Sequence, residues 1–336
     1  MDRSDPRYHA YVQILKEELI PAMGCTEPIA LAYAGAVARR TLGELPDRVT
    51  VQASGSIIKN VKSVIVPNTD HLKGIDAAVS AGIVAGDPDK KLEVIASVTP
   101  EQIQAMKQFM DEVPIEIEHI DKGCTFDIVV IVHHKDEYAK VRIANYHTNI
   151  VLIEKNGEIL EQAKVSGDSE DGLTDRNLLD MEHIWDFAMT VEIDEVKALL
   201  DQQISCNMTI ADEGLKNDYG ANIGKVLLAM DGDNVRVKAK AMAAAGSDAR
   251  MNGCELPVVI NSGSGNQGIT TSVPVIIYAR ELHASEEKLY RALTLANLTT
   301  MSRHRSGDFP HTVEPLEPVQ ARAQELLIFV VGATKK

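Results

Sequence analysis

A cysteine lies at the start of a predicted helix, in residues 24–28 (GCTEP). Backbone N–H groups and the positive end of the helix dipole lower the pKa of a thiol in such a position, which makes the thiolate available as a base or nucleophile. Thr26 is the residue that we expect to cap this helix. We therefore take Cys25 and Glu27 as candidate catalytic residues and Thr26 as a candidate substrate ligand. The alternative is a capped helix start with an inert cysteine.

A histidine follows a predicted strand in residues 146–149 (YHTN). Because the ordinary pKa of histidine lies near neutrality, an imidazole among polar side chains can exchange protons at physiological pH. His147 is thus a third candidate catalytic residue, and Thr148 and Asn149 are candidate substrate ligands. The alternative is a histidine on the surface of a strand.

An arginine, Arg250, lies near the end of the polar segment 246–251 (GSDARM). A planar guanidinium binds a carboxylate through two parallel hydrogen bonds, so this segment can hold the carboxylate of a substrate. Its candidate substrate ligands are Ser247, Asp248 and Arg250. The alternative is an ion pair between Asp248 and Arg250 that braces a loop.

Three glycines alternate with Asn, Ser and Gln in residues 261–268 (NSGSGNQG). Such a loop exposes many backbone N–H donors and can bind a carboxylate or a phosphate. It is not a Walker A motif, because no Gly-Lys-Ser/Thr follows. The candidate substrate ligands here are Asn261, Ser262, Gly263, Ser264, Gly265, Asn266 and Gln267.

The elements that must position these segments follow from hydrophobic periodicity and turn signals. The sequence predicts helices over residues 8–20, 29–45, 75–86, 100–112, 177–190, 191–215, 222–230 and 285–299. It predicts strands over 49–55, 63–68, 92–98, 115–120, 126–134 and 139–160, the last with an Asn156–Gly157 hairpin turn. Residues 166–175 are a predicted linker.

This order of elements predicts an α+β protein whose mostly helical catalytic domain is interrupted by an α/β insertion. We expect the helical domain to comprise residues 1–45 and 175–300, and the insertion to comprise residues 46–165. Residues 301–336 form a tail of different character. If the sites act together, Cys25, Arg250 and the 261–268 loop must share one pocket.

Composition limits the partners of the chain. The formal net charge of the 336 residues is −15, which disfavours nucleic acid and anionic membranes. The N-terminal residues do not resemble a signal peptide and no apolar run reaches the length of a membrane span, so we expect a cytoplasmic protein. The four cysteines are scattered without a CxxC pair, and we expect no disulfide. The family resemblance given in the next paragraph implies a small amino acid as the ligand, and a homodimer is a reasonable assembly for such an enzyme.

The four segments occur in the order and approximate spacing of one family. From about residue 10 to residue 300 the chain resembles the L-cysteine desulfidase family, which is related to the alpha chain of iron–sulfur L-serine dehydratases. The resemblance implies a lyase with a 4Fe–4S cluster, which releases sulfide or water from L-cysteine or L-serine and yields pyruvate and ammonia. It implies that Cys25 is the proton acceptor and that Arg250 and the loop hold the amino acid. Asn60 is a further polar candidate ligand.

The chain departs from that family in its last third. The resemblance implies cluster cysteines in segments such as IGRLSAYC, yet no cysteine follows Cys254. If the codons of residues 301–336 are read one base over, the genetic code permits a string that begins IGRLSAYCGA. We therefore hypothesise a frameshift near codon 301 and expect the cluster not to assemble, leaving this chain with little or no activity.

Two other functions are compatible with the residues. The SGSGNQG segment loosely resembles the phosphate-binding loop of pyridoxal-phosphate lyases, with Lys59 as the Schiff-base lysine. Alternatively, the chain is a non-enzymatic protein that binds an amino acid without turning it over.

Overall fold

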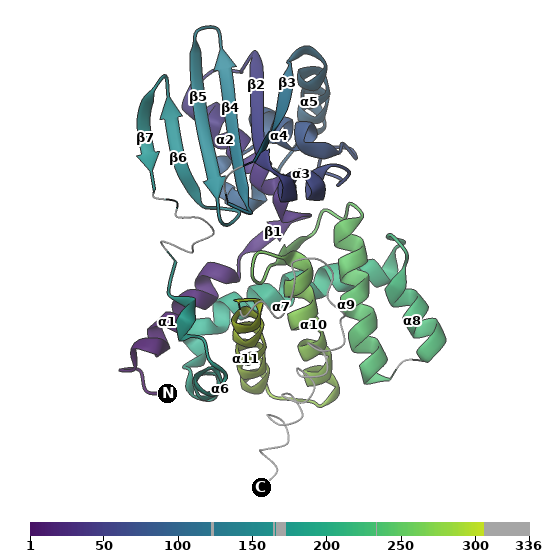
Figure 1. Ribbon diagram of the computed structural model, residues 1–336. Coiled ribbons are helices and arrows are strands. Elements are labelled where there is room, and N and C mark those ends of the chain that lie inside the picture. The colour runs from purple at the N-terminus through teal and green to yellow at the C-terminus, as the bar shows by residue number, and fades with distance from the viewer. Residues whose placement is uncertain (122–123, 164, 166–172, 233, 306–336) are drawn as a thin grey trace. The chain divides into compact units, whose positions relative to one another are not determined.

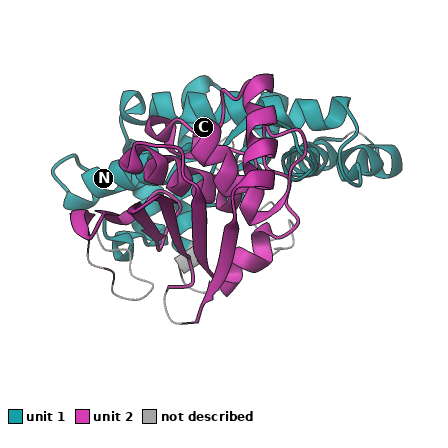
Figure 2. Cartoon of the chain, turned by 90° about the horizontal axis from the view of Figure 1, so that it is seen from above, with its two compact units in different colours: residues 1–21, 173–336 teal, residues 22–172 magenta. Residues whose placement is uncertain are grey.

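The computed structural model describes residues 1–121, 124–163, 165, 173–232 and 234–305. The protein is α+β with a helical majority, as predicted. The chain divides into two compact units, coloured separately in Figure 2. Unit 1 comprises residues 1–21 and 173–336, and unit 2 comprises residues 22–172. The helical unit is therefore interrupted by the unit that holds the large sheet.

Unit 2 contains a six-stranded mixed sheet and the helices that cover it (Figure 1). Its elements are β1 (Pro21–Met23, where the chain enters the unit), α2 (Thr26–Leu42), β2 (Arg48–Ser54), α3 (Gly55–Val61), α4 (Gly74–Ala85), η1 (Pro88–Glu93), α5 (Pro100–Glu112), β3 (Ile115–Ile120), β4 (Asp127–His134), β5 (Glu137–Ala144), β6 (Ile150–Lys155) and β7 (Glu158–Gln162). The strand order is β3-β2-β4-β5-β6-β7, in which only the β2–β3 pair is parallel.

Small residues bring α2 and α4 into close contact. A Cβ added to Gly82 would lie 1.8 Å from the Ala32 carbonyl oxygen, and one added to Gly35 would lie 2.8 Å from that of Val79. On its other side α2 packs on β4 and β5. The expected boundary near residue 45 is therefore displaced to residue 22, because α2 packs on the sheet of unit 2 and not with the helical unit.

Two predicted strands of unit 2 have other conformations. Residues 63–68 contribute only an isolated bridge between Ile65 and Lys73. Residues 92–98 overlap η1 and a turn, where Lys91 has a positive φ of 48°. The predicted hairpin turn is present, with positive φ at both Asn156 and Gly157.

Unit 1 is built from helices around α7. Its elements are α1 (Pro6–Glu18), η2 (Arg176–Leu178), α6 (Met181–Thr190), α7 (Ile193–Lys216), α8 (Ile223–Asp231), α9 (Val235–Met251), β8 (Pro257–Val259), α10 (Gly265–Glu281) and α11 (Glu286–Arg305). The long helix α7 packs against α9, α10 and α11. Most of the predicted linker 166–175 and all of 306–336 lie outside the described residues.

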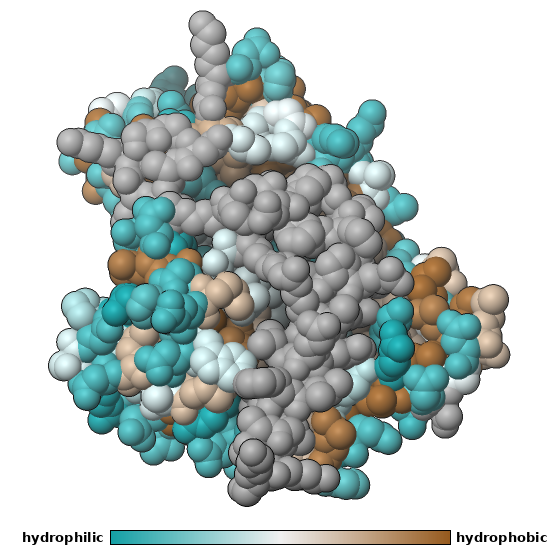
Figure 3. Space-filling view, turned by 60° about the horizontal axis from the view of Figure 1, so that its bottom comes forward, coloured by the Kyte–Doolittle hydropathy of each residue, from teal (hydrophilic) through white to brown (hydrophobic). Residues whose placement is uncertain are grey.

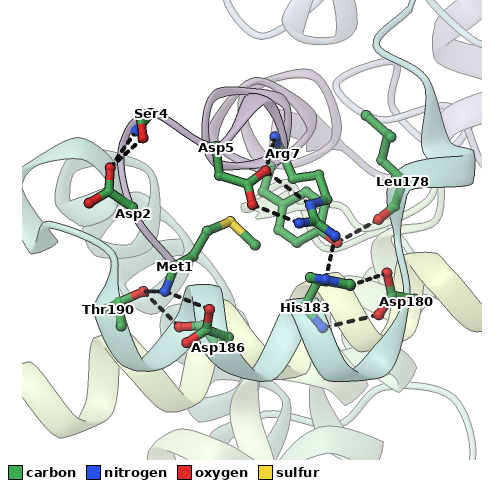
Figure 4. Close-up of polar contacts among 11 residues, drawn as sticks. Met1, Asp2, Ser4, Asp5, Arg7, Leu178, Asp180, His183, Asp186 and Thr190 are labelled. Atoms are coloured by element: carbon green, nitrogen blue, oxygen red, sulfur yellow. Dashed lines mark hydrogen bonds and ion pairs between the residues drawn. The ribbon is translucent and has the colours of Figure 1, made fainter.

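Polar contacts join the first helix of unit 1 to α6, between residues 176 positions apart in the sequence (Figure 4). Asp5 caps α1 and binds Arg7 through both carboxylate oxygens. Arg7 in turn contacts His183 Nε2, and His183 Nδ1 lies 2.6 Å from Asp180 Oδ2. Because hydrogen bonds from Arg7 outweigh the effect of burial, the pKa of Asp5 falls to about 2.

The surface of unit 1 has one helix with little burial. On α8 only Gly224 is buried, and Ile223, Val226 and Met230 are exposed. Figure 3 shows hydrophobic surface at the right, where α8 lies. Among the described residues no helix combines the length and the hydropathy needed to cross a bilayer.

Candidate functional site

The start of α2 is fixed by a glycine that tolerates no side chain. Gly24 has φ of 56°, and a Cβ there would lie 2.3 Å from Pro67 Cγ. The turn delivers Cys25, with extended backbone, to the N-cap position of α2. The expectation that Thr26 caps the helix is therefore wrong, because Thr26 is already the first helical residue.

The Glu27 carboxylate gathers the candidate residues of unit 2. Cys25 Sγ donates to Glu27 Oε2 at 2.9 Å, and Thr26 Oγ1 lies 3.3 Å from the same oxygen. Asn60, on α3, donates from Nδ2 to Glu27 Oε1 at 3.4 Å. Asn60, which the sequence identified separately, thus joins the three residues of the GCTEP segment in one cluster of thiol, hydroxyl, carboxylate and amide.

His147 lies in the turn between β5 and β6. Its ring packs edge-on against Phe126, with centroids 4.5 Å apart. Asn149 closes the turn, since its Nδ2 donates to the Ala144 carbonyl oxygen at 2.9 Å. The backbone of Thr148 also belongs to the turn, where its carbonyl accepts from Ile150 at 3.1 Å.

The segment before Phe126 also contacts α3, which carries Asn60. The Thr125 carbonyl oxygen accepts hydrogen bonds from Ser54 Oγ at 2.7 Å and from Ser56 Oγ. These bonds hold the segment that leads into β4, and with it Phe126, against the start of α3. Lys59, the lysine of the pyridoxal alternative, lies exposed in the last turn of α3.

In unit 1, Arg250 is bound to the glycine-rich loop. The Arg250 side chain is buried near the end of α9, and its Nη1 donates to Asn266 Oδ1 at 3.0 Å. A Cβ on Gly265 would lie 2.3 Å from Arg250 Nε, so this position requires glycine. Gly265 and Asn266 form the first turn of α10, whose dipole favours an anion. The guanidinium and this helix end therefore share a preference for negative charge.

Asp248 contacts the start of α8. Its Oδ2 accepts from the backbone N–H of Ile223 at 2.8 Å. Gly220 lies against the same carboxylate. Asp248 thus positions α8, and Ser247 is half-buried beside it on α9.

The glycine-rich loop is a tight turn followed by a capped helix. Asn261 and Ser264 exchange backbone hydrogen bonds at 3.1 and 3.0 Å, with positive φ at Ser262 and Gly263 between them. Ser264 then caps α10 by accepting from the Gln267 N–H at 3.3 Å. The turn is therefore shaped by its own backbone.

A network of buried amides holds this turn, and sequence reasoning missed it. Asn297 Oδ1, on α11, accepts from Asn261 Nδ2 at 2.9 Å and from Gln203 Nε2 at 3.0 Å. Asn207 accepts from the Val259 N–H at 2.8 Å. The sequence offers one sign of this network, which is the helical spacing of two amides. Gln203 and Asn207 are four apart on α7, and the structure shows that both are fully buried.

The four cysteines are the possible thiolate ligands of an iron–sulfur cluster. Cys254 is buried, and desolvation raises its pKa, which favours the protonated form over a ligand thiolate. Cys124 is also buried, whereas Cys25 and Cys206 are half-buried. In the described part of the chain, no three Cys, His, Asp or Glu side chains gather as a metal site. The described residues therefore do not fit a cluster held by three cysteines.

The serine dehydratase alpha chain family matches residues 89–307. A UPF0597 protein of Desulfitobacterium hafniense is 57% identical over 304 residues, which cover 90% of this chain and 70% of that protein. Similar proteins of Lachnoclostridium phytofermentans and Fusobacterium nucleatum are 47% and 46% identical over 291 and 296 residues. These matches cover 87% and 86% of this chain, and 70% and 69% of the relatives. The names of these relatives state no substrate.

Proposed function

Because the chain belongs to the serine dehydratase alpha chain family, we propose that its activity is that of a lyase on small amino acids. The proposed reaction eliminates hydrogen sulfide from L-cysteine, or water from L-serine. The resulting 2-aminoacrylate hydrolyses to pyruvate and ammonia. The pyridoxal alternative is not carried forward, since no feature around Lys59 supports it.

The contact between Cys25 and Glu27 is the observation that carries this proposal. Elimination requires a base that removes the proton from Cα, and a thiol bonded to a carboxylate at 2.9 Å is a pair through which a proton can move. The sequence places this pair at the start of a 17-residue helix. We assign proton abstraction to Cys25.

The carboxylate of the amino acid is the group that we assign to unit 1. Arg250 is only 5% exposed and is oriented by Asn266 at the start of α10. A guanidinium beside a helix N-terminus favours a carboxylate over a neutral ligand. Arg250, with the loop of residues 261–268, is thus the proposed amino-acid carboxylate site.

The described thiols do not form the ligand set of the iron–sulfur cluster expected from the family resemblance, and we assign no step to the cluster in the described residues. We further propose that residues 301–336 result from a one-base shift in the reading frame near codon 301. Sequencing the gene over codons 295–336 tests this directly. The proposal fails if no single-base change restores a continuation with IGRLSAYC-like cysteines.

The decisive experiment is an anaerobic assay of sulfide and pyruvate from L-cysteine, with L-serine in parallel. It compares the 336-residue chain with a frame-restored version reconstituted with iron and sulfide. We expect equimolar sulfide and pyruvate from the restored protein, and little or none from the 336-residue chain. A restored protein that assembles a cluster and releases no product from either amino acid would contradict the lyase proposal.

Matched cysteine variants complete the assay. Cys25→Ala should lower turnover of the restored protein by about 10²-fold or more, the usual contribution of a positioned base. Cys206→Ala changes another half-buried thiol, which belongs neither to the Glu27 cluster nor to the Arg250 site. The turnover of this variant should match that of the unaltered protein. Equal loss in both variants would show damage to folding and would count against the role of Cys25.

A further inference from the structure

The Cys25–Glu27 contact has a defined direction. Because the ordinary pKa of a glutamic acid, about 4.3, lies below that of a thiol, about 8.5, the sulfur is the donor and the Glu27 carboxylate the acceptor. Two other donors, Thr26 Oγ1 and Asn60 Nδ2, also bind the Glu27 carboxylate, one on each oxygen. Both bonds favour the charged carboxylate and fix its orientation toward the thiol.

The charges around Cys25 act in opposite directions. The N-terminus of α2 carries roughly half a positive charge, spread over its first N–H groups, which favours a thiolate. The Glu27 carboxylate carries a full negative charge 2.9 Å from sulfur, which disfavours one. The carboxylate is in direct contact with sulfur, so it favours the thiol form of Cys25.

We propose, resting on the lyase function proposed above, that Glu27 is a second catalytic residue that takes the Cys25 proton and delivers it to the leaving group. The thiol first transfers its proton to Glu27, which gives a thiolate and a carboxylic acid. The thiolate then removes the proton from Cα of the substrate. The electron pair left on Cα forms the Cα–Cβ double bond as the bond from Cβ to sulfur or oxygen breaks.

The departing group leaves with its electron pair and takes the proton from Glu27. The products are 2-aminoacrylate and hydrogen sulfide or water, and the thiol and the carboxylate are restored. No oxidant or further reactant is consumed. The same two residues therefore serve as base and acid in one turnover.

In this cycle the two substrate classes differ in how much their leaving groups need the proton from Glu27. Water is a far weaker acid than a thiol, with pKa values of about 15.7 and about 8.5, so hydroxide needs a proton to leave much more than hydrosulfide does. Glu27 is therefore expected to decide whether β-hydroxy amino acids are accepted. Amino acids with a β-thiol depend on it less.

The test is the pH dependence of Cys25 alkylation in the 336-residue chain, which requires no lyase activity. Iodoacetamide labelling is followed by mass spectrometry of the peptide that contains Cys25, from pH 5 to 10. In Glu27→Gln the pH of half-maximal labelling should fall by about one unit, because the negative charge is lost. A midpoint that stays or rises in Glu27→Gln would overturn the proposal, whatever the lyase assay gives.

Two controls separate this effect from damage to the fold. Glu101→Gln alters the equivalent acidic residue in the first turn of α5, away from any thiol, and should leave the Cys25 midpoint unchanged. Labelling of Cys206, read from the same digests, should be the same in all variants. If Cys206 labelling also changes in Glu27→Gln, Glu27→Asp replaces it: the retained charge should keep the Cys25 midpoint within about half a unit of the original. A fall of one unit or more in Glu27→Asp would refute the role of the charge.

Discussion

Arg250 Nη1 donates to Asn266 Oδ1 at 3.0 Å, and the backbone of Gly265 lies against the same guanidinium. A methyl group at Gly265 would lie 2.3 Å from Arg250 Nε and 2.8 Å from Val258 Cγ2. Gly265→Ala should therefore displace the guanidinium and lower the free energy of unfolding by about 1–3 kcal/mol, as over-packing of a buried site does. Urea unfolding measures the loss, and calorimetry with L-serine or L-cysteine measures any weakening of binding.

Gly246→Ala is the matched control for this substitution. Gly246 lies inside α9, where an added Cβ would find its nearest neighbours at 3.3 Å. The gain in helix propensity, up to about 1 kcal/mol, offsets this mild crowding. If both alanine variants unfold at the same urea concentration as the original chain, the proposed clash at Gly265 is wrong.

Removal of the Asn297 side chain should destabilise unit 1. Its Oδ1 accepts from Asn261 and Gln203, so Asn297→Ala leaves two buried amide donors without their partner. We expect a loss of about 2–4 kcal/mol in urea unfolding. Asn217→Ala, which removes an exposed amide from the end of α7, should cost less than about 0.5 kcal/mol. A loss below 1 kcal/mol in Asn297→Ala would show that the network contributes little.

The Asp5 contacts should make stability depend on acid pH (Figure 4). Hydrogen bonds from Arg7 lower the pKa of Asp5 from 3.8 to about 2. The stabilisation is thus complete above the unfolded value and is lost as the pH falls through the folded value. The Tm of the original chain should exceed that of Asp5→Asn at pH 6, and the difference should vanish between about pH 4 and pH 2.

Asparagine also caps helices well, so this substitution removes the charge and keeps the cap. Asp87→Asn, at the N-cap of η1 in unit 2, is the comparison. A Tm difference for Asp5→Asn that is constant from pH 6 to pH 2 would contradict an origin in the Asp5 charge.

The proposed acid role of Glu27 predicts a change in substrate preference. In a frame-restored, active protein, Glu27→Gln should lower turnover of L-serine by about 10²-fold, the contribution of one general acid. Turnover of L-cysteine should fall several-fold less, because hydrosulfide needs the proton from Glu27 less than hydroxide does. Steady-state kinetics with both amino acids give the ratio, and an equal loss for the two would refute the acid role.

The local signals in the sequence identified most elements and the residues of both candidate sites. These sites are the cluster around Glu27 in unit 2, and Arg250 with the 261–268 loop in unit 1. Glycine and proline at 24 and 28, with the Ala-rich run after them, predicted the helix itself, but α2 begins at Thr26, before the predicted first residue 29. The contact of Glu27 with Asn60 could not be predicted, because it depends on how α3 packs beside α2. Likewise the contact of Asp248 with Ile223, at the start of α8, could not be predicted from the segment 246–251.

The failures have a common physical origin in tertiary packing. Periodicity assigned the helix of residues 29–45 to the helical domain, whereas Gly35 and Gly82 allow α2 to pack on α4 within unit 2. The buried amides of Gln203, Asn207 and Asn297 lie within predicted helices, to which the sequence assigned no polar network. A single sequence shows their polarity and does not show that they are buried.

The interruption of unit 1 by unit 2 has a consequence for synthesis on the ribosome. Helix α1 emerges first, but its partners α6 and α7 follow only after the roughly 150 residues of unit 2. At about 5–20 residues per second, the apolar side chains Tyr8, Tyr11 and Leu15 wait on the order of 10–30 s for their partners. During that interval the apolar side chains of α1 are exposed on the nascent chain. We therefore expect α1 to be a segment that a chaperone binds.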